Sequence, residues 1–353
     1  MERKRRILIA PLDWGLGHAT RCVPLIKALI NRGAEVIIAA SGSSAELLKQ
    51  EFPDLKHYSL PGYNPVYPGN DRMVWNMGTQ LPHFIKTIYA EHAALDLILE
   101  KEKAGVVISD NRYGCYSKNV KSIFISHQLH ILMPGRFKWM EGYVNWFNKR
   151  QISYYSECWI PADNRTLLGN LLPKELPEST RFIGSLSRLA PVTSKSKYDV
   201  VAVLSGPDPQ RSLLAALLRR QIIDSGFKVF LVHGNVAGGE EIKQTGNLTE
   251  ANYLSADGLS EVIAAGNIII SRSGYSTIMD LAKLGKKAIF IPTPGQTEQA
   301  FLAAQLMRMG VAYSMTQEEF NLKNALKESD KFSGFANFEH DDSLLEQAIQ
   351  SIL

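Results

Sequence analysis

Short apolar runs alternate with segments of helical periodicity along the chain. In the first half, such runs predict four buried strands, at 6–10, 35–40, 106–109 and 122–126. A helix is predicted after the first strand, from the loop at 11–17 to about Asn31, where Gly33 follows as an end signal. Buried strands that are separated by helices are typical of a parallel sheet with crossover helices.

The same rhythm restarts in the second half, after a stretch rich in Ser, Lys, Pro and Thr at 184–197 that indicates a linker. Beyond it, strands are predicted at 199–204, 228–233, 267–271 and 287–291, and helices at 209–224, 275–284, 298–309 and 343–353. This pattern predicts an α/β fold with two doubly wound parallel sheets facing a central cleft. Ligands bind outside the carboxyl ends of the strands in such sheets, so we expect the site in that cleft.

The expected division is an N-terminal domain at 1–183, a C-terminal domain at 184–338, and a C-terminal helix at 339–353 that packs back on the N-terminal domain. The length of 353 residues and a hydrophobic content of 45% are sufficient for two cores and exclude wholesale disorder. The formal net charge of +4 is small for this length, so we expect no nucleic-acid partner.

The three cysteines are far apart and have no C-x-x-C spacing, which fits a reducing compartment and neither a disulfide framework nor a zinc site. No apolar run reaches about 18 residues, so we expect no membrane span. The expected location is the cytoplasm, with peripheral contact to a membrane left open.

The loop between the first strand and the first helix carries two glycines and a histidine. Gly15 and Gly17 let the backbone turn tightly and approach a ligand, and the His18 imidazole is suited to accept a proton near neutral pH. The alternative is a plain glycine turn with a local histidine cap, which a lone G-x-G favours. The loop is not a dinucleotide fingerprint, because Thr20 stands where the third glycine would be.

Three loops of the second half also lie between a predicted strand and a predicted helix, where helix N-termini offer free amides to anions. The first, at 270–280, has small polar residues suited to wrapping a phosphate and a cation beside them: Arg272, Ser273, Gly274, Ser276, Thr277 and Asp280. The second, at 291–299, offers Glu298 and Gln299 to sugar hydroxyls. The third, at 205–211, offers Ser205, Gly206 and Arg211. The alternatives are an N-capping segment for the first loop, a solvated first helical turn for the second and a proline-started helix for the third.

The order of these motifs resembles the GT-B glycosyltransferases, and within them the family that adds N-acetylglucosamine to lipid-linked muramyl pentapeptide. The segments that carry the resemblance are 184–188, Ser205-Gly206, 272–277 with Asp280, and 292–299. The likeness covers most of 183–320. In the first domain it rests on the loop that ends at His18 and on Ser126-His127-Gln128. Two Rossmann-like domains and a metal-independent, inverting transfer from a UDP-linked sugar to a hydroxyl acceptor are what the resemblance implies.

The resemblance also implies roles for individual residues. The diphosphate would be held by Arg188, Ser205, Gly206, Ser273, Gly274, Ser276 and Thr277, with Arg211 and Arg272 as further cations. Asp280 would bind the ribose, and Glu298 and Gln299 the sugar. On the acceptor side would lie Gly15, Gly17, His127 and Gln128, with His18 as the general base. Asp110 is a second candidate base, or alternatively a strand-end cap. The chain has no Asp-x-Asp motif, so we expect neither a metal nor another cofactor.

The stretch 133–159 mixes aromatic and basic residues. A helix through it would put Phe137, Met140, Val144 and Phe147 on one face and Trp139 and Trp146 on another. Such a surface suits either a membrane interface, as a lipid-linked acceptor would require, or a partner or substrate.

Two other functions remain open at this point. A nucleotide-sugar hydrolase of the same fold would use His18 to activate water, and its first loop would resemble Gly15 to His18 followed by Arg21-Cys22. A non-catalytic nucleotide-sugar-binding protein would need the phosphate loop but not the histidine.

Overall fold

The computed structural model describes the chain except residues 1–4, 67–72, 207, 224, 236–237 and 339. Positions 207, 224 and 339 of the predicted loop, helix and C-terminal segment therefore lie outside the described residues. Two compact units divide the described chain. The first comprises 5–66, 74–186 and 340–353, and the second comprises 187–338. The chain thus passes from one unit to the next after Leu186 and returns to the first unit at His340.

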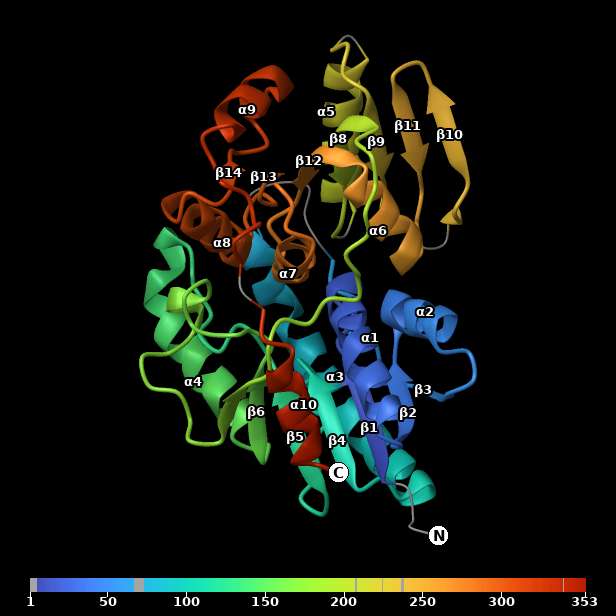
Figure 1. The fold of residues 1–353 in the computed structure, drawn as a ribbon. Coiled ribbons are helices and arrows are strands. Elements are labelled where there is room, and N and C mark those ends of the chain that lie inside the picture. Colours follow the sequence, from blue (N-terminus) through green and yellow to red (C-terminus); the bar gives the residue numbers. More distant parts are fainter. Residues whose placement is uncertain (1–4, 67–72, 207, 224, 236–237, 339) are drawn as a thin grey trace. The chain divides into compact units, whose positions relative to one another are not determined.

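The first unit is built on a seven-stranded sheet in the order β3-β2-β1-β4-β5-β6-β7 (Figure 1). Its strands are β1 (Arg6–Pro11), β2 (Glu35–Ala40), β3 (Lys56–Ser59), β4 (Val106–Asp110), β5 (Lys121–Ile125), β6 (Glu157–Ile160) and β7 (Thr180–Phe182). All six pairings between neighbours are parallel. The central strands are apolar on both sides, as expected for a parallel sheet that helices cover on both faces.

Helices cover both faces of this sheet. On one face, α1 (Leu16–Asn31), α2 (Gly42–Glu51) and α10 (Ser343–Gln350) form a core with Ile7, Ile9 and their neighbours. On the other face, Leu8 and Ala10 pack with α3 (Met73–Glu102). The remaining helices are α4 (Glu141–Ile152) and the 3₁₀ turns η1 (Gly135–Met140) and η2 (Gly169–Leu171).

The second unit has a sheet of the same size in the order β10-β11-β9-β8-β12-β13-β14. Its strands are β8 (Tyr198–Val203), β9 (Val229–Val232), β10 (Ile242–Thr245), β11 (Leu248–Ala251), β12 (Gly266–Ser271), β13 (Ala288–Phe290) and β14 (Tyr313–Ser314). All pairs are parallel except the β10–β11 hairpin. The helices α5 (Gln210–Ile222) and α9 (Leu322–Ser329) share one core with alternate residues of the central strands. The other helices are α6 (Ala256–Ala264), α7 (Tyr275–Lys283) and α8 (Thr297–Arg308).

Both sheets reverse their strand order next to their first strand. In the first unit, the chain proceeds from β1 to β2 and β3 on one side and continues from β4 on the other. In the second unit, β8 leads to β9 and β11 on one side, and β12 and β13 continue on the other. The loops after β1 and β4, and those after β8 and β12, therefore lie at the switch points of the two sheets, where open α/β sheets bind their ligands. A two-domain Rossmann-like α/β fold is confirmed.

Candidate active site

The first unit places His18 and Asp110 at the switch point of its sheet. Asp110 is the last residue of β4, and His18 lies in the first turn of α1. Gly15 occupies the N-cap of α1 with a φ of 95°, a conformation that favours glycine and lets the helix begin directly after the β1 loop. The His18 Nδ1 atom lies 2.8 Å from Asp110 Oδ1. These two residues are 92 positions apart, so their contact could not be predicted from local pattern.

Arg21 is the third member of this group. It lies one turn after His18 on α1, is almost fully buried, and donates hydrogen bonds from Nε and Nη2 to both carboxylate oxygens of Asp110. Its Nη2 also lies 2.9 Å from His18 Nδ1, and its Nη1 lies 2.9 Å from Nδ1 of His127. The guanidinium therefore joins α1, β4 and the loop after β5. Arg21 is not among the predicted site residues, although its spacing of three from His18 on a helix places both on one side.

The surroundings set the charge of this group. Burial alone would raise the pKa of Asp110, but the charge of Arg21 and the hydrogen bonds from Arg21 and His18 hold it well below its usual value. For His18, burial and the neighbouring Arg21 charge outweigh the attraction of Asp110 and lower the pKa. At neutral pH the site therefore holds an ionised carboxylate, a guanidinium and an uncharged imidazole. Asp110 is placed to orient His18 and is poorly suited to accept a proton itself.

The other predicted residues of the first unit lie around this group. Gly17 is inside the first turn of α1, and its carbonyl accepts a hydrogen bond from Thr20 Oγ1 at 3.0 Å. His127 is buried and Gln128 half-buried, both directly after β5. The Ser126 hydroxyl accepts from the Gln128 amide and donates to its carbonyl, which fixes the turn that carries them. The structure thus brings His18, Asp110 and His127 together around Arg21.

In the second unit, the loops after β8 and β12 flank the corresponding switch point. Gly206 has a φ of 92°, and a Cβ there would meet no atom within 4 Å. Ser205 is half-buried beside it. Gly234, after β9, lies so close to this loop that its Cβ would come within 2.3 Å of the Leu204 carbonyl oxygen. These glycines bring bare backbone to the edge of the sheet, as a phosphate-binding loop requires.

The loop after β12 leads directly into α7. Gly274 is its N-cap, and a Cβ there would meet only Thr277 Oγ1, at 4.0 Å. Ser276 and Thr277 are half-buried in the first turn, whereas Ser273 is buried and donates its hydroxyl to the Gln299 carbonyl at 2.8 Å. The side chain of Ser273 thus ties two loops together. The amides at this helix start carry the partial positive charge that suits an anion.

Asp280 lies in the second turn of α7, beside Ser187 at the start of the second unit. Ser187 donates its hydroxyl to Asp280 Oδ1 at 2.5 Å. Burial raises the pKa of Asp280 to about 6, although Ser187 and the Arg188 charge act in the opposite direction. Arg188 itself donates to the Tyr253 hydroxyl at 3.3 Å and lies over the same ring. Asp280 is therefore a carboxylate that titrates close to neutral pH.

The two remaining predicted cations, Arg272 and Arg211, bind neighbouring loops of the second unit. Arg272 is buried, and its guanidinium donates to the carbonyls of Ile291, Pro292 and Gln210 and to Gln317 Oε1. Arg211 donates to the Gly234 carbonyl and forms an ion pair with Asp208. These bonds engage both guanidinium groups with neighbouring loops, and their contact with a diphosphate stays a prediction. Burial lowers the pKa of Arg272 to about 10, which leaves it charged at neutral pH.

The loop after β13 carries the two residues predicted for sugar hydroxyls. Gln299 accepts from the Thr293 amide at 2.8 Å and donates to Gln296 Oε1 at 2.5 Å, so its side chain closes its own loop. Glu298 is half-buried in the first turn of α8. Among the described residues, no three His, Cys, Asp or Glu side chains are grouped to hold a metal ion.

The aromatic and basic stretch forms η1 and α4. Its predicted apolar face, from Phe137 to Phe147, is half-buried, whereas Trp139 and Trp146 are 71% and 66% exposed. In the part of the chain that the structure describes, no helix is long and apolar enough to cross a membrane.

Comparison with known proteins adds to this picture. Residues 201–351 match the Glycosyltransferase family 28 C-terminal domain. An uncharacterized glycosyltransferase of Methanosarcina acetivorans is 24% identical over 338 residues, which cover 86% of this chain and 84% of that protein. The UDP-N-acetylglucosamine--N-acetylmuramyl-(pentapeptide) pyrophosphoryl-undecaprenol N-acetylglucosamine transferase of Glaesserella parasuis is 33% identical over 108 residues, which cover 29% of this chain and 30% of that protein.

Solved structures are similar over the whole chain at low sequence identity. The glycotransferase of kitacinnamycin has a TM-score of 0.66 and 16% identity, and covers 100% of this chain and 99% of its own. MurG of Acinetobacter baumannii has a TM-score of 0.58 and 14% identity, and covers 99% of this chain and 98% of its own. The likeness to these structures shows the fold, whereas the sequence matches described above indicate the enzyme class, glycosyltransferase.

Proposed function

We propose that this chain, which is a glycosyltransferase with the GT-B fold, moves a sugar from a UDP-linked donor to a hydroxyl acceptor and inverts the anomeric centre. The proposal goes beyond the class in naming the donor, the acceptor group and the residues. The single observation that carries it is the contact between His18 and Asp110, because this contact gives a base in the required protonation state at the switch point of the first sheet.

His18 would act as the general base. In this proposal Nδ1 carries the imidazole proton and donates it to the ionised Asp110, which accepts hydrogen bonds only. Arg21 Nη2, which lies 2.9 Å from the same nitrogen, then binds Asp110 rather than the imidazole. The lone pair is then on Nε2, which takes the proton of the acceptor hydroxyl as its oxygen attacks the anomeric carbon. The carbon–oxygen bond to the diphosphate breaks, and the imidazolium that forms is stabilised by Asp110, as in other carboxylate–histidine pairs.

The second unit would hold the donor. The bare loop at Ser205-Gly206 and the start of α7 at Gly274 offer backbone amides to the diphosphate, and Arg188 offers a cation. Asp280 would accept hydrogen bonds from the ribose, and Glu298 from the sugar. A diphosphate donor is supported by two similar structures whose proteins were solved with thymidine diphosphate. In this proposal amides and guanidinium groups neutralise the leaving group, with no metal required.

The acceptor would be lipid-linked. This part of the proposal rests on two observations. A relative that is named for an undecaprenol-linked substrate matches this chain over 30% of its own length. The side chains of Trp139 and Trp146 are exposed in a stretch that also carries basic residues. The acceptor would approach the first unit, which holds His18.

The donor is tested by thermal shift against UDP, ADP, GDP, thymidine diphosphate and NAD. We expect a shift with UDP that exceeds the others and is insensitive to EDTA. A response to NAD alone would overturn the proposal.

The base is tested with His18→Ala, and with His57→Ala as a matched control in the same unit, because His57 binds the Phe52 carbonyl away from the site. We expect kcat for UDP release in the presence of a lipid-linked acceptor to fall about 10²–10⁴-fold in His18→Ala, with the Kd for UDP within twofold of wild type. Unchanged turnover removes His18 from the mechanism. Equal UDP release without any acceptor would identify a hydrolase.

A further inference from the structure

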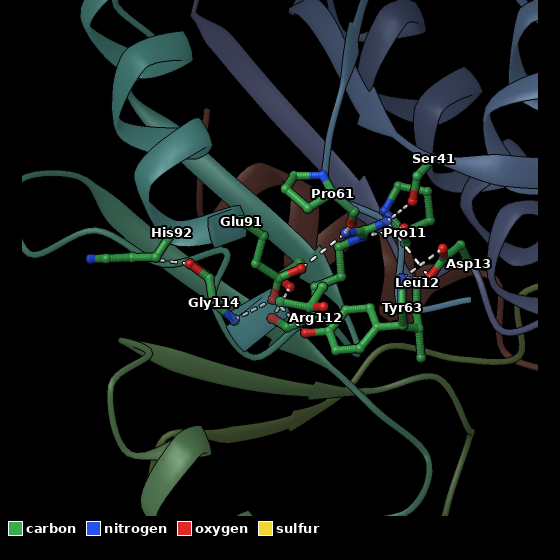
Figure 2. A network of polar contacts seen from close by, with 12 residues as sticks. Pro11, Leu12, Asp13, Ser41, Pro61, Tyr63, Glu91, His92, Arg112 and Gly114 are labelled. Atoms are coloured by element: carbon green, nitrogen blue, oxygen red, sulfur yellow. Dashed lines mark hydrogen bonds and ion pairs between the residues drawn. The ribbon is translucent and has the colours of Figure 1, made fainter. Parts of the chain in front are cut away.

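A second buried charge network lies on the other side of the β4 end, and no step proposed above uses it. Arg112 follows Asp110 by two residues and is fully buried. Figure 2 shows its guanidinium at the centre of contacts from several loops. Nε donates to the Pro11 carbonyl at 2.7 Å, Nη1 to the Pro61 carbonyl at 3.0 Å, and Nη2 to Ser41 Oγ. One side chain thus binds the loops after β1, β2 and β3.

Glu91 of α3 is the counter-charge of Arg112. Its Oε2 accepts from Arg112 Nη1 at 2.9 Å, and its Oε1 accepts from the Tyr63 hydroxyl at 2.7 Å and the Gly114 amide at 2.6 Å (Figure 2). The approach of Gly114 is so close that a Cβ there would come within 2.2 Å of the Ile88 carbonyl oxygen. Glu91 thus accepts hydrogen bonds from a guanidinium, a phenol hydroxyl and a backbone amide.

The network is connected to the His18 loop at two points. Pro11 pairs with Asp110 in the sheet, and the Leu12 amide donates to the Asp110 carbonyl at 2.9 Å. The next residue, Asp13, accepts from the Tyr63 amide at 3.1 Å and lies 3.9 Å from Arg112 Nη2. The segment from Pro11 to Asp13 leads directly to Gly15 and α1. Its path is set on one side by Asp110 and on the other by Arg112.

The backbone conformation of Asn111 separates the contacts of Asp110 from those of Arg112. Asn111 has a φ of 63°, and its amide donates to the Ile125 carbonyl at 3.1 Å. The left-handed turn sends Asp110 to Arg21 and His18, and sends Arg112 to Pro11, Ser41 and Glu91. Asparagine tolerates this conformation better than most residues. The end of β4 therefore contributes one charged residue to each side of the first loop.

Stability alone is a weak reason to bury such a pair. The desolvation of two charges offsets most of their attraction, and apolar replacements of the same volume are often as stable. What an ion pair with five hydrogen-bonding partners does supply is a fixed position for each of the loops that it joins.

We propose that Arg112, held by Glu91, is a positioning residue that sets the His18 imidazole against Asp110 by fixing the path from Pro11 to α1. The proposal rests on the proposed function only in so far as His18 is the base. Arg112 does not touch the reacting atoms in this account, since it acts through the loop.

The experiment uses Arg112→Lys, which keeps the charge but cannot donate to all of these acceptors, and Tyr63→Phe, which removes one bond to Glu91 and leaves Arg112 in place. Arg165→Lys is the matched control, because Arg165 also binds backbone carbonyls in the first unit, those of Pro173 and Lys174, away from His18. The readout is ¹⁵N-detected imidazole NMR of the full-length protein, with the His18 signals assigned by their loss in His18→Ala.

In the wild type we expect the His18 proton on Nδ1, protected from exchange. In Arg112→Lys we expect this signal to be lost or averaged between tautomers, with kcat about 10–100-fold lower and the Kd for UDP within twofold of wild type, since a small misplacement of a catalytic group is costly. Tyr63→Phe should give a smaller effect in the same direction, and Arg165→Lys none.

A wild-type His18 signal in both Arg112→Lys and Tyr63→Phe overturns the positioning role, whatever the activity. If Arg112→Lys fails to fold by near-UV circular dichroism, Tyr63→Phe alone decides. If the variants alter the His18 signal but the wild-type protein itself transfers no sugar, the positioning role is supported and the proposed function is rejected, so the two failures are distinguishable.

Discussion

The two switch points of this chain have the same topology but opposite electrostatic designs. In the first unit, the charged groups neutralise one another inside the protein: Arg21 binds Asp110, and Arg112 binds Glu91. In the second unit, the buried Arg272 makes its hydrogen bonds to three carbonyls and an amide oxygen. The first design fixes the orientation of side chains. The second leaves a positive potential beside the start of α7, which suits an anionic ligand.

The acidic residues of the two sites differ in the same way. Arg21 and His18 overcome the effect of burial and lower the pKa of Asp110, whereas burial dominates at Asp280 and raises its pKa to about 6. A carboxylate that is fully paired keeps its charge and serves as a fixed anchor. A carboxylate that is only partly paired changes its protonation near neutral pH, and its interactions change with it.

The largest effect should come from removing the anchor of the first unit. Asp110→Ala leaves the buried Arg21 without its carboxylate, and breaking a buried pair by loss of one partner costs about 3–5 kcal/mol. Urea denaturation should show this loss in the free energy of unfolding. Asp96→Ala is the control, because Asp96 is exposed and forms only a 4.0 Å pair with His92, a type worth about 0–1 kcal/mol. Equal losses in the two variants would show that the Asp110 cluster is not a tightly coupled unit.

An intermediate effect is expected from pH at the second site. Asp280 is ionised above about pH 6, so its capacity to accept hydrogen bonds from a ribose falls as pH decreases through that value. We expect the Kd for UDP, measured by calorimetry, to weaken about 3–10-fold more between pH 7 and pH 5 in wild type than in Asp280→Asn. Asp280→Asn serves as the control, because the phosphate groups of UDP titrate in the same way with the variant and with wild type. Identical pH profiles would exclude Asp280 from nucleotide binding.

The smallest effect concerns the outer surfaces, where the units also differ. Among the described residues, the exposed large aromatic side chains all belong to the first unit: Trp14, Trp75, Tyr89, Trp139, Tyr143 and Trp146. We expect a few-fold weaker flotation with anionic vesicles for the Trp139→Ser/Trp146→Ser double variant, since aromatic side chains insert at the lipid interface. Leu213→Ser, an exposed apolar site of the second unit, serves as the control. Binding that ignores the anionic lipid would end the membrane proposal.

Sequence pattern predicted eight interior strands of the two sheets to within one or two residues, but not the interior strands β6 and β11. Strands such as β1, β2, β8 and β12 are continuous apolar runs, which is the strongest local signal for a buried parallel strand. The edge strands did not stand out. β3 has the sequence KHYS and β10 the sequence IKQT, and both are short and polar because one side of an edge strand meets solvent. Their pairing is a tertiary property.

The candidate site could be located from sequence more easily than its contacts. The glycine loops and His18 follow predicted strands, so their place at the sheet edge followed from topology. The partners did not, because Arg21 and Asp110 are 89 residues apart and Arg112 and Glu91 are 21 apart. The contacts of Arg272 were not predictable either. A cation beside a phosphate loop predicts contact with the diphosphate, and the structure adds that the Arg272 side chain is buried and binds backbone carbonyls.

The last helix completes the core that the first strand begins. Ala348, Ile349 and Ile352 of the α10 segment pack in one cluster with Ile7 of β1 and Val23 of α1. During synthesis on the ribosome, the first unit therefore lacks part of its hydrophobic interior until the whole second unit has emerged. The described residues 187–338 of the second unit all precede the last helix, so their core does not wait for it. We therefore expect the second unit to complete its core before the first unit during synthesis, although it is made later.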